Sequence, residues 1–183
     1  MNILLDALPE SVEIDGIDYP VNWGYRTFIN IEMCIFDTKI SDSTRLLVAF
    51  DYFYGENLPP DPSQAFEKMM WFYRGGVEEK KSEGKRKGSS ARRCYCFEQD
   101  AAYIYSAFLT QYDIDLNALF SKDLHWWKFK AMFESLDDEL KISKIMGYRL
   151  TNTTGMDKNQ KKFYADMKKL YALDVETGAD AKM

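Results

Sequence analysis

His125 is the only histidine of the chain and the first candidate for acid–base chemistry, because its ordinary pKa lies near neutral pH. Catalysis would require a nucleophile or an orienting carboxylate beside it. The sequence contains no Gly-x-Ser-x-Gly, no Cys–His signature and no His-x-x-x-His pattern. We therefore expect no catalytic residue, and we expect His125 to be hydrogen-bonded inside a helical core.

Three cysteines, Cys34, Cys94 and Cys96, are the candidate metal ligands. Cys94 and Cys96 are close in sequence, but a zinc site would need two further ligands and the chain offers one histidine. An odd number of cysteines without a secretion signal favours free thiols in a reducing compartment. We expect neither a metal site nor a cofactor site.

Two acidic groups have the side chains that acid–base catalysis or Mg²⁺ binding would need: Asp113 with Asp115, and the run Asp137, Asp138 and Glu139. Both groups lie at predicted helix boundaries. Carboxylates at such positions cap helices or interact with the helix dipole. We therefore predict a capping role for them.

The adjacent tryptophans Trp126 and Trp127 are candidates for stacking on bases or sugars. Neighbouring residues of a helix diverge by about 100°, so the two rings cannot form one stacking platform. We expect them to pack on two sides of a central helix. If one were exposed, it would be an anchor for a partner, since tryptophan is enriched at binding hot spots.

The composition predicts one folded domain that is mostly α-helical, over residues 1–173. The chain has 183 residues, of which 46% are hydrophobic and 15% aromatic, enough for a sizeable core. No run approaches the roughly 20 apolar residues that cross a bilayer, and the N-terminus lacks a basic secretion signal. The net charge of −5 argues against a protein that coats nucleic acid.

The expected elements are a small N-terminal β-hairpin at about 11–21 and six to seven helices. Asp15-Gly16 is the favoured pair for a type I′ turn. Apolar periodicity then predicts helices from about Trp23, from Ser41, from Asp61 to the glycines at 75–76, over 97–112, over 122–136, from about 140 to Gly147, and from Asp157. In the third helix the predicted core stripe is Phe66, Met69, Met70 and Tyr73, and in the last it is Phe163, Met167, Leu170 and Tyr171.

Two polar segments interrupt or follow this pattern. Residues 77–93 form a basic segment in which the stretch Glu78–Ser90 has no apolar side chain, so we predict a flexible loop. This loop is either a solvated insertion or a contact for an acidic partner or nucleic acid. Residues 174–183 are predicted to be a polar C-terminal tail.

Several short motifs occur in a characteristic order along the chain. They are the opening Leu8–Gly16, Trp71-Phe72-Tyr73 before Gly75, Phe97–Asp100, His125–Phe129, Met146–Arg149 and Met167–Leu173. In order and spacing they resemble the bacteriophage gene-product-fifteen family, over nearly the whole chain. The resemblance implies a small protein encoded among phage tail genes near the tape-measure gene, with no enzyme motif.

The resemblance therefore implies tail morphogenesis, with the protein as a tail assembly chaperone that binds the tape-measure protein or another tail protein. It would act in the host bacterial cytoplasm during assembly. The alternative is a minor structural component of the virion, at a tail terminus or head–tail joint; a nucleic-acid binder using the basic segment is a third reading. The candidate partner-binding residues are Met69, Met70, Trp71 and Trp127, because Met-rich, aromatic surfaces adapt to varied partners. The same four residues also suit a plain core.

Overall fold

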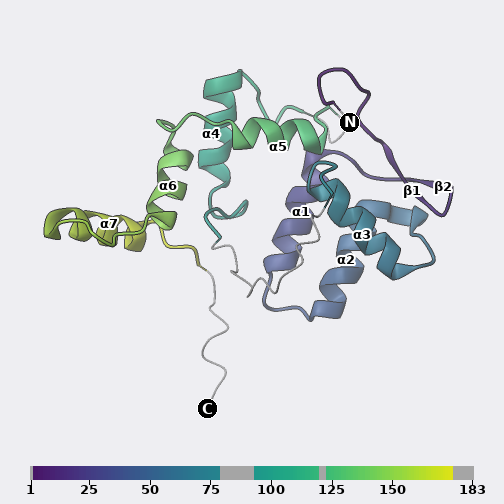
Figure 1. The fold of residues 1–183 in the computed structure, drawn as a ribbon, viewed down its shortest axis with the longest axis horizontal. Helices are drawn as coiled ribbons and strands as arrows, with labels where there is room; N and C mark the ends of the chain where they lie inside the picture. The colour runs from purple at the N-terminus through teal and green to yellow at the C-terminus, as the bar shows by residue number, and fades with distance from the viewer. Residues whose placement is uncertain (1, 79–92, 120–122, 175–183) are drawn as a thin grey trace, which may run out of the picture. The chain divides into compact units, whose positions relative to one another are not determined.

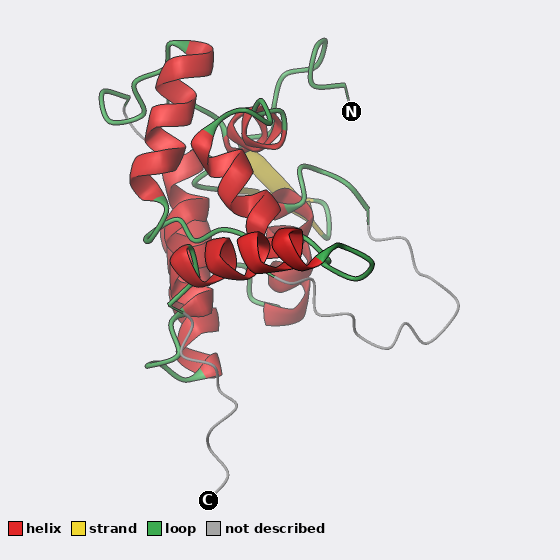
Figure 2. Cartoon of the chain, turned by 90° about the vertical axis from the view of Figure 1, so that its left-hand side faces the viewer, coloured by secondary structure: helices red, strands yellow, loops and turns green. Residues whose placement is uncertain are grey.

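The computed structural model describes residues 2–78, 93–119 and 123–174 (Figure 1). In these ranges it has seven α-helices and one two-stranded hairpin, so the mostly α-helical fold is confirmed (Figure 2). The elements are β1 (Ser11–Ile14), β2 (Ile17–Pro20), α1 (Tyr25–Phe36), α2 (Asp42–Tyr54), the 3-10 turn η1 (Gly55–Asn57), α3 (Pro62–Tyr73), α4 (Ala101–Tyr112), α5 (Trp126–Glu134), α6 (Lys141–Leu150) and α7 (Lys158–Leu170).

The chain divides into two compact units. Unit 1 comprises Met1–Lys85 with Ala118–Glu134, and unit 2 comprises Arg86–Asn117 with Ser135–Met183. The single domain expected over residues 1–173 stays a prediction. The basic segment 77–93 and the tail 174–183 lie almost entirely outside the described residues.

The N-terminal hairpin forms where its turn chemistry predicts it. Asp15 and Gly16 both have positive φ, of 51° and 77°, as a type I′ turn requires. The antiparallel register pairs Val12 with Tyr19. Val12 and Ile14 are buried, whereas Ile17 is exposed. The hairpin packs on α3 through β1, which gives two marginal strands the support that they need.

The capped helix starts are also where the sequence predicts them. The Oγ atom of Ser41 accepts a hydrogen bond from the backbone N–H of Thr44 at the start of α2. The carboxylate of Asp61 accepts from the N–H groups of Ser63 and Gln64, with Pro62 at the first helical position. These local bonds satisfy N–H groups that the helices leave without an intrahelical partner.

The predicted core stripe of α3 is wrong in part. Phe66 is exposed, Met70 and Tyr73 are half-buried, and the buried side chains are Ala65, Met69 and Phe72. Two overlapping apolar stripes exist on this helix, and the core contacts select one of them. Phe72 stacks on Phe28 of α1 at 5.5 Å and meets Phe53 of α2 edge-on at 5.3 Å between ring centroids.

The helix expected over 122–136 is shorter than predicted, because α5 begins at Trp126 and ends at Glu134. Before it, the chain makes a turn and then forms an antiparallel bridge between Gly24 and His125. The N–H of Tyr25 donates to the carbonyl of Leu124, and the N–H of Trp126 donates to the carbonyl of Trp23. The bridge occupies backbone groups that a longer helix would use.

In unit 2, α6 packs against both α4 and α7, and two predicted boundaries are wrong. The turn at Phe97–Asp100 precedes α4, so the helix begins at Ala101 rather than at Phe97. Gly147 does not end α6, which continues to Leu150. By contrast, α7 starts with the predicted capping box, in which the Asp157 carboxylate and the Gln160 side chain bond each other's backbone N–H.

None of the helices in the described part of the chain is both long and apolar enough to span a bilayer.

Candidate interaction surface

The C-terminal end of α3 is joined to α5 by the two adjacent tryptophans. The indole N–H of Trp127 donates to the carbonyl of Phe72 at 2.7 Å, and the indole N–H of Trp126 donates to the carbonyl of Tyr73 at 2.9 Å. These carbonyls belong to the last turn of α3, where the regular helical N–H partners are missing. The carbonyl of Phe72 also accepts the N–H of Gly75 in the turn that follows. The Trp-Trp pair thus satisfies one helix end, and two motifs far apart in sequence form one structural feature.

Gly76 is required by the same contact. Its φ is +78°, which L side chains rarely adopt, and a Cβ atom there would lie 2.5 Å from Cη2 of Trp127. Trp71 meets the Trp127 ring edge-on at 5.5 Å between centroids. The glycine therefore ends α3 and also leaves room for the indole.

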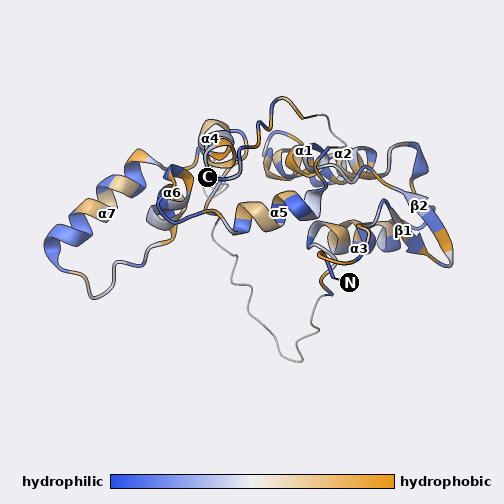
Figure 3. Cartoon of the chain, turned by 90° about the horizontal axis from the view of Figure 1, so that it is seen from above, coloured by the Kyte–Doolittle hydropathy of each residue, from blue (hydrophilic) through white to orange (hydrophobic). Residues whose placement is uncertain are grey.

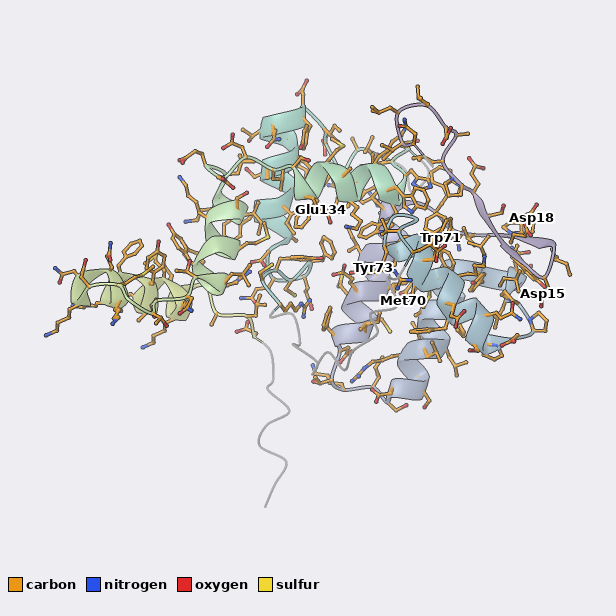
Figure 4. All side chains as sticks on the ribbon, viewed as in Figure 1. Asp15, Asp18, Met70, Trp71, Tyr73 and Glu134 are labelled. Carbon is orange, nitrogen blue, oxygen red and sulfur yellow. The ribbon has the colours of Figure 1, made fainter. Side chains whose placement is uncertain are left out.

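The structure separates the four predicted partner-binding residues into two pairs. Met69 is 2% and Trp127 5% exposed, so both are core residues of unit 1 and cannot be touched by a partner without repacking. Met70 and Trp71 are half-buried and come from the C-terminal half of α3 (Figure 4). Burial against Gly76 and Phe72 is the physical reason that Trp127 is not an accessible anchor, and the accessible candidates narrow to Met70 and Trp71.

His125 is hydrogen-bonded inside unit 1, as predicted. Its Nδ1 accepts the backbone N–H of Trp127 at 3.0 Å, which is how an N-cap side chain acts at the start of α5. Since Nδ1 accepts, the proton resides on Nε2, which donates to the carbonyl of Pro9 at 3.0 Å. Burial lowers the pKa of His125, and protonation of Nδ1 would remove the cap.

A buried ion pair organises unit 2, and the sequence analysis missed it. The guanidinium of Arg149 donates to both carboxylate oxygens of Asp100, at 2.6 and 3.0 Å, and both side chains are buried. The same guanidinium also donates to the carbonyls of Cys94 and Tyr171. The available signal was the apolar stripe of α6, in which Arg149 takes the place that follows Ile142 and Ile145 at helical spacing.

Among the carboxylates predicted to cap helices, Asp113 occupies the C-cap position of α4, whereas Asp115 and Asp137 hold turns. The Oδ1 of Asp115 accepts the N–H of Asn117, and the Oδ1 of Asp137 accepts the N–H of Glu139. The residue that precedes α6 is Leu140, which offers no capping side chain. Within the described ranges, no group of three or more His, Cys, Asp or Glu side chains is placed to hold a metal ion, and Cys34, Cys94 and Cys96 are free thiols.

Large aliphatic side chains are exposed at separate places on the surface. Leu4 and Leu5, in a turn at the N-terminus, are 87% and 81% exposed. Leu47 on α2 and Leu170 on α7 are 64% and 65% exposed. Figure 3 shows hydrophobic and hydrophilic residues alternating along the helices. Single exposed apolar side chains are common on protein surfaces and by themselves do not mark an interface.

A protein-family model described as "Bacteriophage Gp15 protein" matches residues 4–173, which is most of the chain. No curated protein matches the sequence. No solved structure matches it.

Proposed function

The chain belongs to the bacteriophage Gp15 family, and from this membership we propose that it is a non-enzymatic tail assembly chaperone that binds the tape-measure protein. The sequence resemblance implies a gene among the phage tail genes, near the tape-measure gene. The proposal places the protein in the host cytoplasm while tails are being assembled.

The side chains that could do chemistry form hydrogen bonds inside the protein, and this supports a binding role. Both nitrogens of His125 bond backbone groups, and the guanidinium of Arg149 is fully engaged by Asp100 and two carbonyls. Catalysis needs a group that can reach a substrate, and these groups are directed inward. Their contacts hold helix ends and turns together.

The observation that carries the proposal is the partial exposure of Met70 and Trp71, a methionine and a tryptophan that are adjacent in the C-terminal half of α3. A tape-measure protein is long and helical, and its apolar stripes need cover before the tail tube surrounds them. A helical protein covers such stripes by helix-in-groove contacts. Methionine and aromatic side chains suit this task because they adapt to varied partners.

Co-expression with the cognate tape-measure protein tests the proposal. We expect the two proteins to co-purify and the tape-measure protein to become more soluble. Because the contact at Met70 and Trp71 is apolar, the part of the binding that it contributes should weaken little between low and moderate salt. Trp71→Ala should reduce binding by about 2 kcal/mol if Trp71 lies in the interface. Tyr103→Ala, at an exposed position of α4, is the matched control, and circular dichroism must show that both variants remain folded.

A minor structural component of the virion, at a tail terminus or a head–tail joint, is the competing function. Mass spectrometry of purified virions separates the two functions, because a chaperone leaves the finished particle and a structural protein stays. If the protein is present in mature virions and neither co-purifies with nor solubilises the tape-measure protein, the chaperone proposal is wrong.

A further inference from the structure

The last helix, α7, is amphipathic but has no buried residue. An isolated helix of this length is marginal in water, so packing must support it. Its own support is the capping box at Asp157 and its contact with α6. Phe163 and Leu170 nevertheless remain 48% and 65% exposed. The helix is therefore formed although part of its apolar face remains exposed to solvent.

The contact with α6 covers this apolar face only in part, and about half of the Phe163 side chain and more of Leu170 remain exposed. Tyr148 of α6 meets Tyr164 at 6.2 Å and Tyr171 at 6.1 Å between ring centroids, and Lys168 donates to the carbonyl of Thr151. Tyr148 also touches Phe163, at 5.9 Å between centroids. At 100° per residue, Phe163 and Leu170 lie on the opposite edge of the stripe from Tyr164. We call this pair the open edge of α7.

The polar face of α7 is strongly basic. The helix carries five lysines and one carboxylate, Asp166, in a chain whose net charge is −5. Lys158, Lys161, Lys162 and Lys169 form no ion pair with a carboxylate in the described part of the chain. Figure 3 shows the strongly hydrophilic colour of this helix beside its hydrophobic segments. The local charge is thus opposite to that of the whole protein, and ion pairs among residues 2–78, 93–119 and 123–174 do not neutralise these four lysines.

We propose that the open edge of α7 docks an acidic, amphipathic helix of a partner protein. Phe163 and Leu170 are seven residues apart, which is two helical turns, the spacing at which a second helix can lie along α7. Acidic residues flanking the partner's apolar stripe would face Lys162 and Lys169 and give the contact its selectivity. The inference deepens the proposed function, on which it rests for the identity of the partner.

Asp166 favours a protein partner over a lipid surface. It lies between the open edge and the flanking lysines Lys162 and Lys169 on the helical projection. At an anionic membrane this carboxylate would face phosphate headgroups at the point of insertion, which is unfavourable. On a partner helix, a single basic or polar residue accommodates it.

Two designed peptides of about 20 residues test the charge and shape of the partner. Both carry leucine at i, i+3 and i+7; one has mostly glutamate at its other positions and the second has lysine there. Fluorescence anisotropy should show that the glutamate peptide binds the full chain at least about tenfold more tightly than the lysine peptide does. Equal affinity for the two peptides, or no binding of the glutamate peptide, would overturn the proposal.

Variants locate the contact on α7. The double variant Phe163→Ser/Leu170→Ser should weaken binding of the glutamate peptide about tenfold or more, because it removes both apolar anchors. Leu47→Ser, at a similarly exposed leucine of α2, is the matched control and should leave the affinity unchanged. Lys162→Glu/Lys169→Glu should reduce the preference for glutamate over lysine. If the Phe163/Leu170 variant binds as the wild type does, α7 is not the docking site.

Other occupants of the open edge give different results. A dimer in sedimentation velocity that the Phe163→Ser/Leu170→Ser variant abolishes would identify a second copy of the chain and overturn the proposal. Binding to phosphatidylglycerol vesicles that depends on the same residues, in the absence of peptide binding, would overturn it in favour of a membrane.

Failure of this inference can be told apart from failure of the proposed function. If the Phe163→Ser/Leu170→Ser variant still solubilises the tape-measure protein as the wild type does, the docking site is wrong and the chaperone function stands. If the glutamate peptide binds through Phe163 and Leu170 but the tape-measure protein does not co-purify, the docking site stands and the chaperone function is wrong.

Discussion

Unit 1 and unit 2 bury polar groups in different ways. In unit 1, neutral donors on the rings of Trp126, Trp127 and His125 bond backbone carbonyls, and the rings themselves fill the core. In unit 2, one charged pair, Asp100 with Arg149, gathers several backbone segments. Unit 1 therefore distributes its buried polar contacts over several neutral rings, whereas unit 2 gathers them on one charged pair.

The difference has an energetic consequence. A neutral hydrogen bond contributes about 0.5–1.5 kcal/mol net, so the loss of one indole bond is tolerable. Removal of one partner from a buried ion pair leaves an uncompensated charge, which costs about 3–5 kcal/mol. A single substitution should thus disturb unit 2 more than a polar substitution of similar size disturbs unit 1.

The largest effect is expected from Arg149→Met. It leaves the buried Asp100 carboxylate without its cation and the carbonyls of Cys94 and Tyr171 without their donor. The free energy of unfolding, measured with urea, should fall by about 3–5 kcal/mol. The double variant Asp100→Leu/Arg149→Met should recover part of this loss because no charge stays buried. A loss below about 1 kcal/mol for the single variant would show that the pair does not organise unit 2.

A somewhat smaller effect is expected from Gly76→Ala in unit 1. The new methyl group would meet the Trp127 ring and would force alanine into a positive φ. Strain and displacement of the indole should together destabilise the protein by about 2–3 kcal/mol. Gly155→Ala is the control, because its φ is also positive, at +84°, but no atom lies within 4 Å of its added Cβ. If the two variants lose equal stability, the contact with Trp127 contributes nothing.

The next largest effect is a dependence of stability on pH, which arises from His125 in unit 1. Burial holds the pKa of His125 below its ordinary value of 6.5, so the unfolded chain binds the proton more readily. The stability contributed by neutral His125 is complete above pH 6.5 and is lost as pH falls from there through the lowered pKa. Urea midpoints between about pH 5 and 8 should show this decline.

His125→Asn isolates that effect, because asparagine keeps an acceptor for the N–H of Trp127 and does not titrate. The wild type should lose more stability than this variant on acidification. Parallel curves for the two proteins would remove His125 as the titrating group.

The smallest effect is expected from Asp157→Ala in unit 2. It removes the cap of α7, which is worth about 1 kcal/mol. Because α7 has no buried residue, the cost should appear as local fraying rather than as global unfolding. Hydrogen exchange should accelerate in α7 and stay unchanged in α6. Equal acceleration in both helices would show that α6 and α7 unfold together.

Short-range chemistry made several elements predictable. The turn at Asp15-Gly16, the caps at Ser41, Asp61 and Asp157, and the helical periodicity each depend on residues within a few positions of one another. The order of the motifs further predicted the family, which the family model confirms.

Only the tertiary structure decided how these elements meet. It selected Phe72 rather than Phe66 for the core, shortened α5 at the bridge from Gly24 to His125, and paired Asp100 with Arg149. It also showed that Trp127 is a core residue and that α7 is left partly uncovered. The reason is the range of the interactions. Caps and turns depend on neighbours in sequence, whereas burial depends on side chains tens of residues away. Periodicity alone cannot decide which of several apolar stripes those distant side chains cover.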